Sequence, residues 1–325
     1  MNRGWLVAGL TLAFYGCESC GRDIPSRIRV AGPTPYVRCL AVDPPKDRRW
    51  KVGAATLSTR GRTLAIEGID PPIRIVAFSG PAYVRSSIER QLREMSLKKP
   101  DLALLLGGVG DDKETASRSL RALGKMDFPT LVLAGGRDSW PFIKSAFSSL
   151  DPPARDRVIN LTAMRSVQIG NSLFIPVAGS AEGRYALGEN ACGFNQIDLE
   201  QIADVLPEED GDRRWLIAWE APAVDKENSI CRTSGGIDVG SPELGAFTKR
   251  VGAGSGLFAW PYVQVMRPYS STRGSRIPFG IKTEDFHLVV PRLIGPAMDR
   301  DDGSYGRPGF AVLQIDEKGA VVESP

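Results

Sequence analysis

Three apolar runs end in glycine-rich turns, and the side chains at these tips are where chemistry could take place. The runs and their tips are Ile73–Phe78 before Ser79-Gly80, Leu102–Leu106 before Gly107-Gly108, and Thr130–Ala134 before Gly135-Gly136-Arg137-Asp138. Ligands of open α/β sheets bind beyond the carboxyl ends of the strands. We therefore expect the three tips to lie together on one rim, where their side chains decide which reactions are feasible.

The glycine clusters on this rim do not form a nucleotide-binding motif. Gly108-Val109-Gly110 begins like a dinucleotide fingerprint, but Lys113 occupies the third glycine position. The Gly-Lys-Ser/Thr of a P-loop is also missing. The pattern therefore favours tight strand-to-helix turns over a phosphate cradle.

Nucleophilic catalysis and histidine metal sites have little support. His287 is the chain's single histidine and lies in an apolar run, which predicts a structural role. One histidine removes most Ser/His and Cys/His schemes and every site that needs two histidine ligands. Asp111, Asp112 and Asp138 could bind a hard cation weakly. Helix capping and pairing with a helix dipole are the alternative roles for these aspartates.

The elements that must position the rim form a strand–helix alternation. Helical spacing of apolar residues follows each run, within Tyr83–Leu97, Ala116–Leu123 and Ile143–Leu150. Such an alternation predicts a parallel sheet with helices on its faces. Asp138 or Ser139 is expected to cap the third helix, because a short oxygen side chain can accept from the free N–H groups of a first turn.

Other segments predict hairpins, further strands and two more helices. Trp50–Leu57 and Arg62–Ile66 are predicted to form an N-terminal hairpin around Ser58–Gly61. Ser241-Pro242-Glu243 is typical of a helix start. The remaining predictions are a hairpin at Ser166–Ile169 and Ser172–Val177, a helix at Phe194–Leu206, strands at Arg214–Glu220, Gly256–Met266, Phe286–Val290 and Phe310–Ile315, and a polar loop at Ser270–Asp285.

The length and net charge of the chain limit the size of its core and the class of its partners. With 325 residues, 42% of them hydrophobic, the chain is long enough for a sizeable core. Its formal net charge is only +3, and its basic residues are scattered. We therefore expect no nucleic-acid partner.

The first residues have the pattern of an export signal. Arg3 precedes a short apolar run, Trp5–Tyr15, which is followed by Gly16-Cys17. This resembles a bacterial lipoprotein signal, so we predict a signal peptide at 1–16, lipidation of Cys17 and a tether at 17–48. The alternative is an ordinary secretory signal with a chance cysteine. Anchoring by lipid would make the membrane a partner and place the protein in a bacterial cell envelope.

Four further cysteines could form disulfides. They are Cys20, Cys39, Cys192 and Cys231. Four cysteines allow two bridges with three connectivities, and the sequence does not select among them.

Five blocks, in this order and spacing, resemble the calcineurin-like metallophosphoesterases. The blocks are Phe78–Ala82, Leu106–Asp111, Ala134–Asp138, Ile217–Pro222 and Phe258–Tyr262. The resemblance implies a two-sheet α/β sandwich flanked by helices (αββα layers). It further implies one domain at 49–325, including the N-terminal hairpin and the C-terminal strands, and a two-metal site on the loops.

Residues without ligating side chains stand at most of the positions where that family binds metal. These positions are Gly80, Ala82, Gly108, Gly136, Trp219, Trp260 and Tyr262. Arg137 stands at the position of the family's acid/base histidine, and Gly107, Gly135 and Asp138 remain to shape the turns. Glycine and alanine cannot ligate through side chains, and an indole nitrogen only donates. A two-metal mechanism needs those ligands, so the resemblance implies a pseudoenzyme with no catalytic residue and no cofactor.

Two interpretations of the altered site remain open. Trp219, Trp260 and Tyr262 could simply fill the former metal cavity. Alternatively, these aromatic residues and Arg137 could bind a small anionic or sugar-like ligand. The expected role is binding or structural, with an envelope protein as a further partner. The alternative function is a metal-dependent phosphoesterase with a reduced carboxylate site at Asp111, Asp112 and Asp138, which would need a divalent cation.

Overall fold

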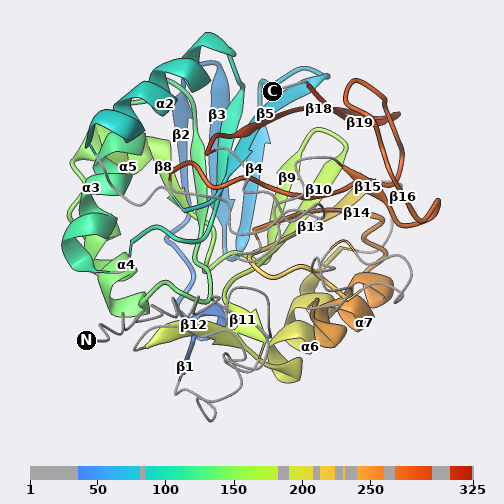
Figure 1. Cartoon of the computed structure of the whole chain (residues 1–325). Coiled ribbons are helices and arrows are strands. Elements are labelled where there is room, and N and C mark those ends of the chain that lie inside the picture. Colours follow the sequence, from blue (N-terminus) through green and yellow to red (C-terminus); the bar gives the residue numbers. More distant parts are fainter. Residues whose placement is uncertain are drawn as a thin grey trace, which may run out of the picture. The chain divides into compact units, whose positions relative to one another are not determined.

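The computed structural model describes most of the chain, and the described residues belong to one unit, Pro33–Pro325. They are residues 36–80, 85–110, 112–181, 190–207, 213–223, 230, 240–259, 268–294 and 308–323. They form two large sheets and one small sheet, with helices beside the large sheets (Figure 1). This is the predicted two-sheet α/β sandwich flanked by helices.

The first large sheet has six strands in the order β19-β18-β5-β6-β7-β8. Its strands are β5 (Ile73–Phe78), β6 (Leu102–Leu106), β7 (Thr130–Leu133), β8 (Val158–Asn160), β18 (Ala311–Asp316) and β19 (Gly319–Val322). Strands β5 to β8 are parallel, and β18 and β19 add an antiparallel edge. The predicted parallel sheet is confirmed, and its first two strands have the predicted bounds.

Four helices cover one face of this sheet. They are α2 (Arg85–Leu97), α3 (Lys113–Leu123), α4 (Trp140–Ser148) and α5 (Pro152–Arg157). Their apolar side chains form one core cluster with Val76, Leu105 and Val132 of the strands. The alternate residues Ile75 and Leu104 are also buried, toward the other sheet. Burial on both faces explains why these strands are continuous apolar runs.

The second large sheet has ten strands in the order β16-β15-β17-β14-β13-β10-β9-β4-β3-β2. Its strands are β2 (Arg48–Val52), β3 (Ala55–Arg60), β4 (Thr63–Glu67), β9 (Ser166–Ile169), β10 (Ser172–Val177), β13 (Arg213–Ala218), β14 (Ser255–Phe258), β15 (Tyr269–Ser270), β16 (Ser275–Arg276) and β17 (His287–Val289). The predicted hairpin of β9 and β10 is confirmed.

Two predictions in this sheet were wrong in detail. The predicted strand Trp50–Leu57 is two strands, because the chain turns at Gly53 with φ +58. The result is a three-stranded meander whose second turn lies at Gly61-Arg62 rather than starting at Ser58. The predicted polar loop Ser270–Asp285 contains strand β16, which pairs with β15.

Helices α6 (Gln196–Val205) and α7 (Pro242–Arg250) lie away from the other four helices (Figure 1). The Ser241 side chain accepts from the backbone N–H of Leu244, and Pro242 takes the first helical turn. This confirms the predicted helix start. Helix α6 begins with a capping box between Asn195 and Asp198. None of the helices in the described residues is both long and apolar enough to cross a membrane.

Part of the predicted tether belongs to the fold. Strand β1 (Tyr36–Arg38) pairs with β12 (Ala191–Phe194), which also pairs with β11 (Ser180–Ala181). A short 3-10 helix, Cys39–Ala41, follows β1. The lack of a clear period in Gly21–Pro35 indicates a tether, but residues 36–41 of the predicted 17–48 tether are held in place by long-range contacts.

Two interactions fix this N-terminal segment. A disulfide joins Cys39 and Cys192, which are both fully buried. The Arg38 guanidinium donates to both carboxylate oxygens of Asp198, at 3.1 and 2.6 Å. The carboxylate raises the pKa of Arg38 by hydrogen bonding and by its charge. The structure thus pairs two of the four candidate cysteines, while Cys20 and Cys231 lie outside the described residues.

Candidate functional site

The tips of β5, β6 and β7 meet, as the sequence predicts, and we call Ser79–Gly80, Gly107–Gly110 and Gly135–Asp138 the rim. The backbone N–H of Gly80 donates to the Gly107 carbonyl at 2.9 Å, and the Gly107 N–H donates to the Leu133 carbonyl at 2.8 Å. A Cβ atom on Gly108 would lie 2.7 Å from the Gly80 Cα atom. The backbones therefore pack too closely at this point for any larger residue.

Asp138 is the central side chain of the rim. Its carboxylate is fully buried and accepts hydrogen bonds from backbone N–H groups of its own loop and of the loop after β6. One oxygen accepts from Gly108 at 2.9 Å and Gly135 at 2.7 Å, and the other from Val109 at 2.8 Å and Gly110 at 3.5 Å. These four donors leave little lone-pair capacity for a metal ion.

The surroundings of Asp138 set its charge state. Burial raises the pKa of the Asp138 carboxyl to about 6, and the backbone donors act in the opposite direction. The expected capping role was wrong. Ser139 is the N-cap residue of α4 but makes no side-chain cap bond, and the Asp138 carboxylate faces the β6 loop instead.

Trp219 fills the space between two rim turns. It follows β13 of the second sheet and is 3% exposed. A Cβ atom on Gly107 would lie 2.2 Å from the indole Cδ1, and one on Gly135 would lie 2.3 Å from the same atom. The indole edge therefore rests directly on the backbone of the two glycines, at the tips of β6 and β7.

Glu220 is a fully buried residue that follows Trp219 in the chain, and its role is not evident from the residue pattern. One of its oxygens accepts from the backbone N–H of Ala181 at 2.9 Å and from the Ser180 hydroxyl at 3.3 Å. Like Asp138, it joins the backbone of a distant loop to the end of a strand. The sequence signal for such a role is an acidic residue that closely follows an apolar strand.

The other predicted site residues are more dispersed. Arg137 is half-buried, Gly136 is buried, and Asp112 is exposed as the N-cap of α3. The Asp112 carboxylate accepts from the N–H groups of Glu114 and Thr115 and from the Thr115 hydroxyl, and these bonds lower its pKa. The predicted positions Ala82, Asp111, Trp260, Tyr262 and Cys17 lie outside the described residues.

His287 is buried in β17, which belongs to the second large sheet and not to the sheet of the rim strands. Its ring stacks on Phe258 with centroids 6.0 Å apart, and burial lowers its pKa to about 4. Its Nδ1 atom has no hydrogen-bond partner among the described residues. These features are those of a neutral core residue.

The described rim residues do not fit the two-metal site that the family resemblance implies. Gly80, Gly108 and Gly136 offer no ligating side chain, and Asp138 is occupied by backbone donors. The described residues hold no group of three His, Cys, Asp or Glu side chains arranged to bind a metal ion. The space over the turns of β6 and β7 is taken by Trp219. No reaction step through metal can therefore be assigned to these residues.

Comparison with known proteins gives likeness at the level of fold. No protein-family model and no curated protein matches the chain. The solved structure of TT1561 of Thermus thermophilus superposes with a TM-score of 0.54 and 14% identity, covering 78% of this chain and 98% of that one. A second solved structure gives a TM-score of 0.54 and 11% identity, covering 78% and 99%. The shared feature is the two-sheet α/β sandwich, since such low identities show the fold alone.

Proposed function

We propose that this chain is a non-catalytic protein of metallophosphoesterase-like fold that has a binding or structural role at a bacterial cell envelope. The observation that carries the proposal is the Trp219 indole lying against Gly107 and Gly135. In a catalytic site of this kind, two metal ions would clamp a phosphate and generate the attacking hydroxide. An indole packed on bare backbone leaves no ligand for those ions at these turns.

The burial of Trp219 supports core filling over a repurposed pocket at this position. A side chain that is 3% exposed presents almost no surface to a ligand. A large aromatic ring also stabilises the rim by removing apolar area from water. Arg137 is half-buried, so an anion-binding role for the rim would depend on that guanidinium.

Metal content is the decisive test of the non-catalytic proposal. The full chain is purified in detergent without chelator, dialysed against manganese, zinc or iron, and analysed by elemental mass spectrometry. We expect far less than one ion per chain and no hydrolysis of 4-nitrophenyl phosphate. One or two bound ions per chain would overturn the proposal and favour the reduced carboxylate site at Asp111, Asp112 and Asp138.

The envelope assignment requires its own experiment. We propose that residues 1–16 are removed and that Cys17 carries the lipid anchor, because an apolar run ends at Gly16-Cys17. Expression in a bacterial host with radiolabelled palmitate should label the wild-type chain and the Cys20→Ser variant. The Cys17→Ser variant should remain unlabelled. Equal labelling of both variants would contradict the anchor.

A further inference from the structure

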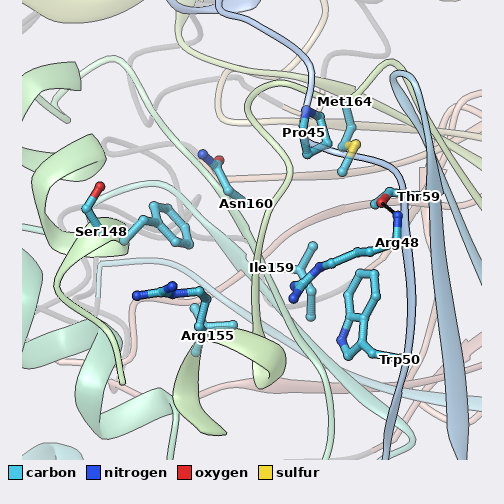
Figure 2. A pocket seen from close by; sticks show the side chains of 11 residues that line it. Pro45, Arg48, Trp50, Thr59, Ser148, Arg155, Ile159, Asn160 and Met164 are labelled. Atoms are coloured by element: carbon cyan, nitrogen blue, oxygen red, sulfur yellow. Dashed lines mark hydrogen bonds between the residues drawn. The ribbon is translucent and has the colours of Figure 1, made fainter. Parts of the chain in front are cut away.

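A pocket of about 420 Å³ lies where the edges of the two large sheets meet, and we call it the edge pocket (Figure 2). Strand β2 forms one wall, and β8 with the ends of α4 and α5 forms the other. Its volume is within the range of small-molecule sites. No rim residue lines it, so inferences about this pocket do not depend on the state of the rim.

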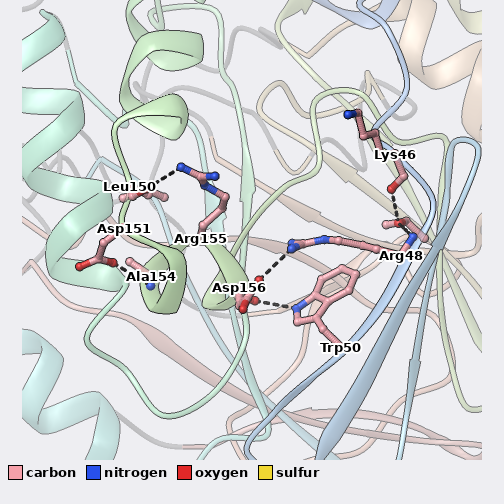
Figure 3. A network of polar contacts seen from close by, with 9 residues as sticks. Lys46, Arg48, Trp50, Leu150, Asp151, Ala154, Arg155 and Asp156 are labelled. Atoms are coloured by element: carbon pink, nitrogen blue, oxygen red, sulfur yellow. Dashed lines mark hydrogen bonds and ion pairs between the residues drawn. The ribbon is translucent and has the colours of Figure 1, made fainter.

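The wall on β2 presents an arginine in a fixed orientation. The Arg48 guanidinium lies over the Trp50 ring, 3.8 Å from its centroid. One of its nitrogens donates to the Asp156 carboxylate at 2.7 Å, while the indole Nε1 donates to the Asp156 carbonyl at 2.8 Å (Figure 3). The Arg48 backbone N–H donates to the Thr59 hydroxyl at 3.1 Å. The contacts of the guanidinium with the Trp50 ring and with Asp156 limit the rotamers of Arg48, which reduces the entropy lost when it binds an anion.

The opposite wall supplies a second cation and neutral polar groups. Arg155 is exposed, and among the described residues its guanidinium donates one hydrogen bond, to the Leu150 carbonyl at 2.9 Å. A guanidinium has five N–H donors, so each arginine keeps several for a ligand. Ser148 and Asn160 add a hydroxyl and an amide on this side (Figure 2). Among the described residues that line the pocket, none is acidic.

The floor of the edge pocket is apolar. Ile159 lies between the two arginine side chains in the view of Figure 2, and Met164 lies at the end near Pro45. Ile159 and Met164 are buried beneath this floor, and Phe147, which is only partly buried, exposes apolar surface to the pocket. A fully hydrated inorganic ion would leave this surface without a partner, whereas an apolar group would cover it.

The geometry points to a binding site for a small organic anion in the edge pocket. The ligand carries a phosphate, phosphonate or carboxylate group that accepts from Arg155 and Arg48, and an apolar body that covers Phe147. This chemistry matches the two guanidinium groups, the lining without acidic residues and the apolar floor. A cation would find no acidic partner among the described lining residues. Asp156 contacts the pocket wall from outside the lining, and its charge is already paired with Arg48.

The test is calorimetric titration of the full chain in detergent with three probes. Phenylphosphonate carries both features and resists phosphatase cleavage, inorganic phosphate carries only the charge, and benzyl alcohol carries only the ring. We expect phenylphosphonate to bind more tightly than either of the other probes. Equal affinity for phenylphosphonate and phosphate, or no heat with phenylphosphonate, would overturn the inference.

Three variants locate the bound probe. Arg155→Gln should weaken phenylphosphonate binding about tenfold, as expected for loss of a charge-assisted hydrogen bond. Arg49→Gln is the matched control and should bind as the wild type does, because Arg49 alternates to the other face of β2 and pairs with Glu67. Arg137→Gln separates this site from the rim. Loss of binding in Arg137→Gln, with Arg155→Gln unaffected, would place the anion on the rim and overturn the inference.

Discussion

The rim and the edge pocket differ in how their charged side chains are satisfied. At the rim, the Asp138 carboxylate is buried and accepts its hydrogen bonds from the protein backbone. At the edge pocket, the Arg48 and Arg155 guanidinium groups each donate one hydrogen bond within the described residues and keep their other donors. A carboxylate whose hydrogen bonds all come from the backbone holds two loops together and has little capacity for a ligand, whereas a guanidinium with unused donors is available to one.

Removal of the disulfide should cause the largest loss of unfolding free energy, and we expect that loss to affect the rim more than the edge pocket. The disulfide closes a sequence separation of 153 residues and joins the 3-10 helix after β1 to β12, and the Cys192 N–H donates to the Asp138 carbonyl at 3.1 Å. Loss of a bridge over so long a loop is expected to cost about 5 kcal/mol of unfolding free energy. Urea unfolding of the Cys39→Ala/Cys192→Ala variant measures this cost.

Hydrogen exchange on the same double variant would localise the change. We expect faster exchange at the Gly135–Asp138 turn and unchanged exchange in β2, which lines the edge pocket. Uniform loss of protection would mean that the bridge stabilises both regions alike. Reductant should not affect the double variant further.

Removing the rim carboxylate should have the next largest effect. Asp138→Ala leaves buried N–H groups without an acceptor, which we expect to destabilise the fold by about 4 kcal/mol. Asp112→Ala removes an exposed N-cap acceptor and should cost about 1 kcal/mol. Thermal and urea unfolding of both variants would test the contrast, and equal costs would show that Asp138 acts only as a local cap.

His287 supplies a pH-dependent comparison with Asp138. Its folded pKa of about 4 lies below the unfolded value of 6.5, so the unfolded state takes up a proton first as the pH falls. Relative to His287→Gln, the wild type should lose about 3 kcal/mol of unfolding free energy between pH 7 and pH 4. Urea unfolding of both proteins at several pH values measures this difference, and a pH-independent difference would contradict a buried neutral imidazole.

The contribution of Asp138 to stability changes with pH in the opposite direction to that of His287. Its folded pKa of about 6 lies above the unfolded value of 3.8, so stability from this group is greatest below pH 4 and falls as the pH rises toward 6. The two groups therefore offset one another in the wild type. Comparison with single variants is needed because the wild-type curve contains both contributions.

Crowding by the indole can be tested at a glycine without positive φ. Gly135→Ala places a Cβ atom against Trp219, and we expect a cost of about 2 kcal/mol. The same substitution in a Trp219→Leu background should cost much less, because the crowding ring is gone. Gly254→Ala is the control, since nothing lies within 4 Å of its Cβ position. Additive costs in the double variant would disprove the contact.

The ion pair at the edge pocket should matter least for stability. The side chains of Arg48 and Asp156 are 41% and 46% exposed. Asp156→Asn is expected to change the unfolding free energy by less than about 0.5 kcal/mol. Chemical unfolding of Asp156→Asn measures this change. A loss of unfolding free energy as large as that of Asp138→Ala would show that charged side chains stabilise the rim and the edge pocket equally.

The sequence by itself determined the parallel strands, the helices that follow them and the start of α7. Continuous apolar runs and helical spacing are local signals, and Ser241-Pro242-Glu243 acts within one turn. The replacement of ligating residues by Gly80, Gly108 and Gly136 could also be read directly. These features depend on the residue types alone or on neighbours within a few positions.

Only the tertiary structure decided the partners of Asp138, the place of Trp219, the pairing of Cys39 with Cys192 and the edge pocket. A local cap was the reasonable expectation for Asp138, yet its carboxylate accepts from N–H groups 28 to 30 residues away. Likewise, Arg48 and Asp156 are 108 residues apart in sequence and meet only because β2 and α5 pack together. Long-range contacts have no period in the sequence, since they arise from the packing of elements that local patterns specify one at a time.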